Sequence, residues 1–188
     1  MRQLVIFLEE RSAKVMLDEF LPRVLPKSVS HRCIPFEGKQ DLDKQIGHRL
    51  KGWLQPNTAF LILRDQDSSN CLVLKESLQQ KALVAGRPDT VICIACHELE
   101  SWYFGDLQSV GAALQIPKLR QHASSSKYRV PDKIVNPSIE LEKITAGRYQ
   151  KVSGSREIGK RLTPSHNTSH SFQVFLKGID KALASIPN

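Results

Sequence analysis

Pairs of acidic residues stand directly behind three apolar stretches of the sequence: Glu9 and Glu10, Asp65 and Asp67, and Glu98 and Glu100. Massed carboxylates repel one another, and a divalent cation is the usual way to hold them together. Ligand sets made only of oxygen favour Mg²⁺ or Mn²⁺ over zinc. Two such ions can stabilise the attacking and leaving oxygens of a phosphoryl transfer. The acids therefore indicate metal-dependent phosphoryl-transfer chemistry, provided that the fold brings them together.

The elements that must position these acids follow from the hydrophobic pattern. Strands are predicted for the apolar runs 4–8, 59–63 and 91–96, and a weaker strand for 29–36. Apolar residues at helical spacing predict helices after each strand, the last of them a long amphipathic helix over 99–114. The order predicts an α/β fold with a mostly parallel, Rossmann-like sheet and helices on both faces.

This fold would gather the acids, because the carboxyl ends of parallel strands lie along one edge of the sheet. Glu9 and the Asp65/Asp67 pair have the greater weight, since each immediately follows a continuous apolar run. The alternative is that Glu10, Asp67 and Glu98 only cap the N-termini of helices.

The charge of the chain is unevenly distributed. Residues 1–115 contain 14 Lys/Arg and 14 Asp/Glu, whereas residues 116–188 contain 13 and 5, which accounts for the whole net charge of +8. We therefore expect two regions, an α/β domain over 1–115 and a basic, mainly helical C-terminal extension over 116–188 that packs on it; residues 121–137 read as a loop. Clustered basic residues attract a polyanion, although a solvated face without a partner is the alternative. The candidates for contacts with a nucleic-acid backbone are Lys127, Arg129, Lys151, Arg156, Lys160 and Arg161.

A strand that ends in Glu, followed by a helix and by a later strand that ends in Asp-x-Asp, resembles the Toprim fold of topoisomerases, primases and nucleases of the overcoming-lysogenization-defect type. Glu98-Leu99-Glu100-Ser101-Trp102, Tyr149-Gln150-Lys151-Val152 and the late Ser171-Phe172 resemble a bacterial Toprim-like family of unknown function. Members of that family are often encoded beside an ABC/AAA-type ATPase and are suspected of anti-phage defence.

The resemblance implies a role for each acid. Asp65 and Asp67 would hold Mg²⁺ or Mn²⁺, Glu100 and Glu98 would complete its ligand shell, and Glu9 would be a general base or a further ligand. Toprim proteins commonly have Gly after the Glu, whereas Glu10 and Arg11 follow Glu9 here, which leaves open whether Glu9 or Glu10 is functional. His97 begins the third acidic segment and is either a proton carrier or a structural residue.

Other motifs carry less weight. Cys93-Ile94-Ala95-Cys96-His97 matches the attachment signature of c-type haem, but its cysteines belong to an apolar strand, so buried core residues are expected rather than haem or redox chemistry. His166 and His170 have zinc-like spacing without a third ligand, and helix capping by Ser169 explains that segment more simply. Asp65-Gln66-Asp67 also fits a haloacid-dehalogenase phosphatase, although there the pair follows the first strand.

The expected partners and location complete the hypothesis. The sequence has no phosphate-binding loop for ATP, so any ATP dependence would come from a partner ATPase. Neither a membrane-spanning stretch nor a secretory signal is recognised, and we expect a cytoplasmic protein whose oligomeric state, a homo-oligomer included, stays open. The expected function is a Mg²⁺-dependent nuclease acting on nucleic acid; the alternative is a non-catalytic Toprim-like binding or sensor subunit of an ATPase complex.

Overall fold

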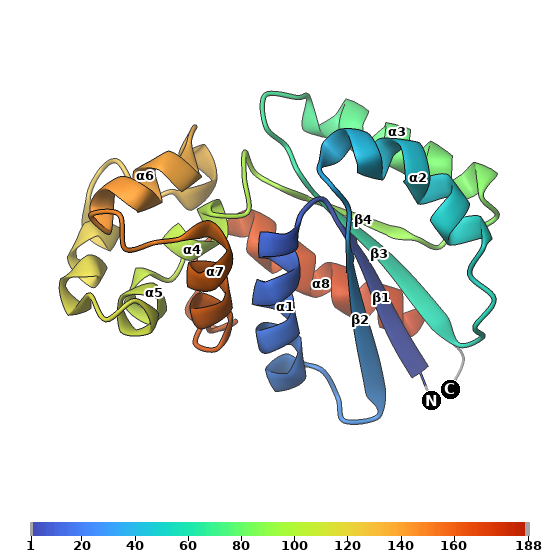
Figure 1. Cartoon of the computed structure of the whole chain (residues 1–188), viewed down its shortest axis with the longest axis horizontal. Coiled ribbons are helices and arrows are strands. Elements are labelled where there is room, and N and C mark those ends of the chain that lie inside the picture. Colours follow the sequence, from blue (N-terminus) through green and yellow to red (C-terminus); the bar gives the residue numbers. More distant parts are fainter. Residues whose placement is uncertain (1, 187–188) are drawn as a thin grey trace.

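The computed structural model describes residues 2–186 and contains one parallel sheet of four strands with helices on both faces (Figure 1). The strands run in the order β2-β1-β3-β4, and every neighbouring pair is parallel. The prediction of an α/β fold with a parallel sheet is confirmed. The strands are β1 (Arg2–Leu8), β2 (Val29–Pro35), β3 (Thr58–Asp65) and β4 (Val91–Ala95).

Two hydrophobic clusters hold the helices on the sheet. Side chains alternate along β1, so that Leu4 and Ile6 face the cluster that includes α1 and α8, while Val5 and Phe7 face the cluster that includes α2 and α3. The helices are α1 (Arg11–Val24), α2 (Lys39–Lys51), α3 (Cys71–Val84), α4 (Ser101–Phe104), α5 (Leu107–Ala113), α6 (Pro137–Ile144), α7 (Lys151–Gly159) and α8 (His170–Ala184).

A helical lobe, formed by α4 to α7, lies beside the sheet at the left of Figure 1. The cluster beneath α1 and α8 continues into it through Leu107, Leu141 and Ile158. Helix α7 packs closely on α1, because a Cβ at Gly159 would collide with the carbonyl oxygen of Met16. The lobe is therefore packed against the sheet region, while the division of the chain at residue 115 stays a prediction.

The prediction of one long helix over 99–114 is wrong, since the two short helices α4 and α5 occupy this segment. Asp106 interrupts it by capping α5, where its carboxylate accepts the backbone N–H of Ser109. The side-chain amide of Asn167 donates to the carbonyl oxygen of Trp102, and the N–H of Thr168 donates to that of Gly105. The carbonyl oxygens of Trp102 and Gly105 thus accept hydrogen bonds from outside the helix, as carbonyls at a helix end commonly do.

The segment predicted as a loop also contains structure, namely 3₁₀ helices over Pro117–Ser124 and Pro131–Lys133. Proline at the first helical position favours such turns, because its fixed φ suits them. Among the helices of residues 2–186, none is both long and apolar enough to cross a bilayer.

Candidate functional site

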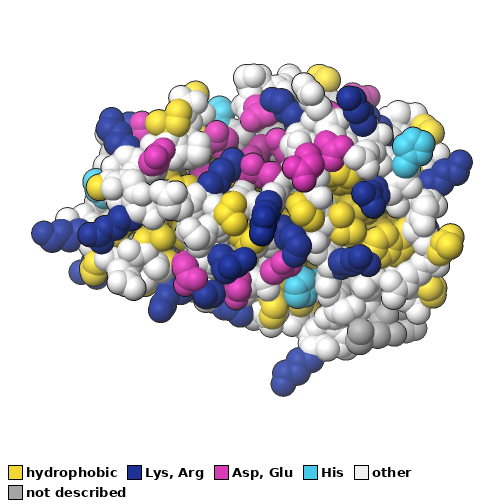
Figure 2. Space-filling model, in the orientation of Figure 1, with side chains coloured by type: hydrophobic (Ala, Val, Ile, Leu, Met, Phe, Trp, Pro, Cys, Tyr) yellow, Lys and Arg dark blue, Asp and Glu magenta, His cyan; other side chains and the backbone are white. Residues whose placement is uncertain are grey.

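The carboxyl ends of β1 and β3 lie side by side at the point where the strand order reverses. Leu8, the last residue of β1, pairs with Leu63 of β3. Glu9, which follows β1, therefore lies near Asp65, the last residue of β3. The backbone N–H of Asp65 donates a hydrogen bond of 3.3 Å to Oε2 of Glu9. Ligands of open α/β sheets bind at such a switch point. Figure 2 shows acidic side chains gathered over this edge, with lysines and arginines around them.

Glu9 is held between one cation and several anions. Nε of the buried Arg64 lies 3.8 Å from Oε2 of Glu9, while its Nη1 donates to the carboxylate of Asp43 at 2.7 Å. Burial raises the pKa of Glu9, the negative charge of Asp67 raises it further, and Arg64 opposes both. A carboxyl group with a raised pKa is suited to accept a proton near neutral pH.

Asp65 faces other acids from the strand ends. Burial is the largest cause that raises its pKa well above the usual value, followed by the negative charges of Glu100, Glu9 and Glu10, while Lys151 opposes them. Such an effect requires the carboxylates to be close to one another. The structure therefore places Asp65 within electrostatic range of Glu9, Glu10 and Glu100, while Asp67 acts in the same way on Glu9 and Glu98 on Glu100.

Glu100 is the most buried of these acids, with 1% of its surface exposed. The hydroxyl of Tyr149 donates a hydrogen bond of 2.8 Å to its Oε1, but within the described residues its buried Oε2 has no hydrogen-bond partner. Burial raises the pKa of Glu100, whereas Lys151 and the Tyr149 hydroxyl lower it. An unpartnered buried oxygen of this kind is satisfied by a proton or a bound cation.

The helical lobe closes this part of the site with a cation. Nζ of Lys151, the first residue of α7, lies 2.8 Å from Oε1 of Glu10. The hydroxyl of Ser12, at the start of α1, donates to the same oxygen at 2.6 Å. Because Tyr149 and Lys151 both contact acids of the strand ends, the lobe and the sheet edge form one site.

Asp67 and Glu98 each have a further partner, although their charges still act on Glu9 and Glu100 respectively. Asp67 forms an ion pair of 2.9 Å with Lys39, and Glu98 accepts the backbone N–H of Ser138 at 2.8 Å in the first turn of α6. The expectation of helix capping therefore applies to Glu98, although the helix is α6 rather than the one that follows it in sequence.

His97 lies in a turn that is tied to the turn after β3. Its φ is +58° and that of Asp67 is +51°, a region that non-glycine residues rarely adopt. The N–H of Asp67 donates to the carbonyl oxygen of His97 at 2.7 Å, so the two turns support each other. Beside them is a hollow of about 330 Å³ lined by Asp67, Ser68, His97, Glu98, Val135 and Asn136.

The donor set at the switch point fits a hard divalent cation. Among residues 2–186, no three Asp, Glu, His or Cys side chains form a ready-made metal site. Even so, Asp65, Glu9 and Glu100 are crowded carboxylates with raised pKa values, and Oε2 of Glu100 lacks a partner. Oxygen ligands of this type suit Mg²⁺ or Mn²⁺.

The six basic residues predicted to contact nucleic acid are exposed, but their surroundings differ. Lys151 belongs to the acidic site, whereas Lys127 forms an ion pair with Glu140 and Lys160 forms one of 2.6 Å with Glu157. The remaining three are Arg129, Arg156 and Arg161, and none of them forms an ion pair within residues 2–186.

Sequence reasoning missed four residues of the site. Arg64 and Lys39 neutralise the acids, Asp43 pairs with Arg64, and Tyr149 binds Glu100. Arg64 could have been found, because a charged residue next to an acid at the end of an apolar strand needs a buried partner. Tyr149 opens one of the motifs that carry the family resemblance, but nothing local in the sequence pairs it with Glu100, and Asp43 and Lys39 have no local signal because their contacts are made by segments distant in sequence.

Of the cysteine motif, Cys93 lies in the core as expected, whereas Cys96 follows the end of β4 and is only half-buried. Burial raises the pKa of the Cys93 thiol to about 12 and that of Cys96 to about 11, which leaves both poorly nucleophilic at neutral pH. In the segment that contains His166 and His170, Ser169 caps α8 by accepting the backbone N–H of Phe172 at 3.2 Å, as expected.

A comparison with models of protein families matches one family over most of the sequence. The model of the family described as "Domain of unknown function (DUF4276)" matches residues 8–180. The matched segment includes all the acids of the site together with Tyr149 and Lys151. Comparisons with curated proteins and with solved structures found no significant match.

Proposed function

The chain belongs to the DUF4276 family, and from this premise we propose that it is a Mg²⁺- or Mn²⁺-dependent phosphoryl-transfer enzyme, a nuclease of Toprim-like fold that hydrolyses phosphodiesters. One observation carries the proposal: Glu9, Asp65 and Glu100 converge at the switch point of a parallel sheet. Burial raises the pKa values of all three, and the negative charges of Glu100 and Glu9 raise that of Asp65 further. Perturbed groups of this kind at the edge of a sheet are typical of functional sites.

The contacts favour particular roles. Asp65 and Glu100 are the best candidates for holding the cation, which would neutralise charge on the phosphate oxygens. Glu9 is the candidate general base that takes the proton of the attacking water. Asp67 and Glu98 would contribute only after leaving Lys39 and the N-terminus of α6.

A path for a polyanion leads away from these acids. The hollow beside Asp67 and His97 shares Val135 and Asn136 with a second hollow of about 240 Å³, which is lined by Lys133 and by Lys127 with its ion-pair partner Glu140. A nucleic-acid strand in these hollows would meet cations beyond the acidic site. This continuity supports a nucleic-acid substrate, because phosphate contacts position a strand without reading its sequence.

The Toprim-like assignment is supported by acids after β1 and β3 in the order β2-β1-β3-β4. The ABC/AAA-type ATPase partner and the role in anti-phage defence are proposals that follow from the same resemblance. Co-purification of the chain with an ATPase encoded beside it tests them.

The decisive experiment combines metal binding with nuclease assays. We expect calorimetric binding of Mg²⁺ or Mn²⁺ and cleavage of DNA or RNA that stops when the metal is chelated. Asp65→Ala should abolish both, whereas Asp89→Ala, an exposed acid before β4, should change neither. Metal binding with an unchanged cleavage rate in Asp65→Ala would contradict the proposed site.

The second candidate is a non-catalytic binding or sensor subunit of an ATPase complex. The ion pairs of Lys151 with Glu10 and of Lys39 with Asp67 favour it, because they neutralise two acids without a metal. A purified protein that binds neither Mg²⁺ nor Mn²⁺ and cleaves no nucleic acid would support this candidate.

A further inference from the structure

Helix α3 is apolar on its outer side as well as its inner side. Leu74, Leu78 and Ala82 are buried against the sheet, yet four other apolar residues are more than half exposed: Leu72 (77%), Val73 (64%), Leu83 (52%) and Val84 (77%). A surface helix normally presents polar residues to water. Exposed apolar groups clustered on one element are typical of interaction surfaces.

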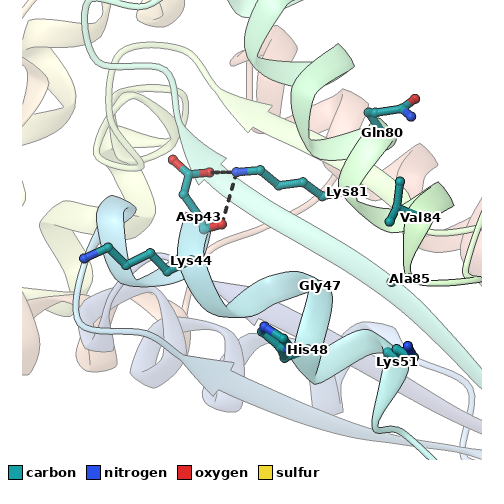
Figure 3. A pocket seen from close by; sticks show the side chains of 9 residues that line it. All are labelled: Asp43, Lys44, Gly47, His48, Lys51, Gln80, Lys81, Val84 and Ala85. Atoms are coloured by element: carbon teal, nitrogen blue, oxygen red, sulfur yellow. Dashed lines mark hydrogen bonds and ion pairs between the residues drawn. The ribbon is translucent and has the colours of Figure 1, made fainter.

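A groove of about 420 Å³ lies between this helix and α2 (Figure 3). Lys44, His48 and Lys51 border it on α2, and Lys81 and Val84 border it on α3. Gly47 leaves the α2 side open, because a Cβ there would meet no atom within 4 Å. Gln80 lines both this groove and a second hollow that includes Leu72 and Leu83 on the outer side of α3. The groove and the apolar side of α3 therefore form one continuous surface, which we call the α2–α3 face.

The α2–α3 face is positively charged. The groove is lined by three lysines, Lys44, Lys51 and Lys81, and by one acid, Asp43, and the hollow on the outer side of α3 adds Lys75 and Glu76. One of these acids, Asp43, already pairs with Lys81 at 2.8 Å and with Arg64 at 2.7 Å. No ion pair within residues 2–186 involves Lys44 or Lys51. Two exposed ammonium groups thus border the groove beside apolar side chains.

We propose that the α2–α3 face is a docking surface for an acidic amphipathic helix of a partner protein. Apolar residues of the partner pack on Leu72, Leu83 and Val84, and its carboxylates meet Lys44 and Lys51. Leu72 and Leu83 are separated by three helical turns, or about 16 Å along α3. A partner helix of three to four turns spans this length, as in other helix-in-groove complexes.

Charge argues for this occupant over a second copy of the chain. In a symmetric dimer the same patch meets itself, so Lys44 and Lys51 of one copy would approach those of the other. Like charges facing one another oppose association. An acidic helix satisfies both the cations and the apolar residues. The proposal does not depend on the nuclease activity, because the α2–α3 face contains none of the acids assigned to catalysis.

Designed peptides test this chemistry directly. The probe is a fluorescein-labelled helical peptide of about 16 residues with Leu on one side and Glu on the others. We compare it with one peptide in which Lys replaces Glu and one in which Ser replaces Leu. At low salt, anisotropy titration should show saturable binding of the acidic Leu peptide, and at least about tenfold weaker binding of the other two. Nuclear magnetic resonance should place the shifted amides in α2 and α3.

Variants of the full chain locate the site. Lys44→Glu with Lys51→Glu should weaken binding at least about tenfold, and so should Val84→Asp. The matched control is Lys177→Glu with Lys181→Glu, two exposed lysines on α8 across the sheet. That control should bind like the original chain, and circular dichroism should show that all variants fold.

Several results would overturn the proposal. They are a failure of the acidic Leu peptide to bind, equal binding of the Lys peptide, and equal weakening by the α8 control. A dimer in sedimentation experiments that Val84→Asp dissociates would assign the face to a second copy. Binding of phosphatidylserine vesicles that Val84→Asp abolishes, without peptide binding, would assign it to a membrane.

Discussion

The acidic edge of the sheet has a buried half and an open half, although the sequence places the acids of both at similar spacing. Glu100 is buried and bonded to Tyr149 of the helical lobe, and its charge, like that of Glu9, acts on the half-buried Asp65, whereas Asp67 and Glu98 lie beside a hollow. The difference begins at the strand ends. Asp65 is the last residue of β3, whereas β4 ends at Ala95, and the turn that follows carries Glu98 toward α6.

This comparison shows that the contacts made with the helical lobe decide the environment of an acid more than membership of an acid-x-acid pair. In the Asp65/Asp67 pair the first acid is enclosed, and in the Glu98/Glu100 pair the second is. Tyr149 and Lys151 of the lobe then complete the enclosure. The buried half has the properties of a metal or proton site, and the open half has those of a contact surface.

The largest expected effect tests the two halves with one matched pair of substitutions. Glu100→Gln should weaken binding of Mg²⁺ or Mn²⁺ on the order of 100-fold, because it removes a carboxylate with an unpartnered oxygen. Glu98→Gln should change the affinity less than about threefold, since its side-chain oxygen can still accept the N–H of Ser138.

Calorimetry with both ions measures these affinities, and thermal unfolding shows whether each variant is folded. Equal losses in the two variants would mean that the open half also holds the cation. A loss only in Glu98→Gln would reverse the assignment.

The second prediction disturbs the lobe that encloses the buried half. Gly159→Ala should lower the free energy of unfolding by about 1–3 kcal/mol, because its Cβ collides with the backbone of α1. Gly47→Ala, also inside a helix, is the control. It should raise stability by about 0.5–1 kcal/mol, since its Cβ meets no atom and alanine favours helices.

Urea unfolding measures both values. The same displacement of α7 should move Tyr149 from Glu100, the proposed ligand that it holds, and weaken binding of Mg²⁺ or Mn²⁺ in Gly159→Ala alone. A stable Gly159→Ala variant with full metal affinity would show that the contact between α1 and α7 does not position the site.

Much of the fold could be predicted from local patterns, because apolar runs and helical spacing are properties of short segments. The strands and the meeting of Glu9 with Asp65 followed from those patterns together with the rule for parallel sheets. The split of the helix over 99–114 could not be predicted, since it depends on hydrogen bonds from Asn167 and Thr168.

The same reasoning explains what was missed in the site. Tyr149 lies in a segment with little local pattern, and only the packing of α7 on α1 brings it to Glu100. The positive charge of the α2–α3 face could not be recognised in the sequence, because the net charge summed over residues 1–115 is zero. The acids that balance it are concentrated at the strand ends, on another part of the surface.

The smallest expected effect is the pH dependence of stability without divalent ions. Asp65 has a folded-state pKa raised above its ordinary unfolded value, so the folded protein binds more protons between the two values. The free energy of unfolding should therefore fall as the pH rises through the folded-state pKa. The contribution of each such group is at most about 1.4 kcal/mol per pH unit. Urea unfolding in EDTA from about pH 5 to 8 measures this slope.

Two variants and one addition separate the halves of the edge. Asp65→Asn removes the repelling charge and should flatten the slope, whereas Asp67→Asn should leave most of it, since Asp67 is paired with Lys39. Saturating Mg²⁺ should raise stability most at neutral pH, because the ionised carboxylates bind the cation and the proton competes with it. A slope that neither Asp65→Asn nor Mg²⁺ changes would mean that the crowded acids are not the groups that titrate, and the buried half would lose its distinction from the open one.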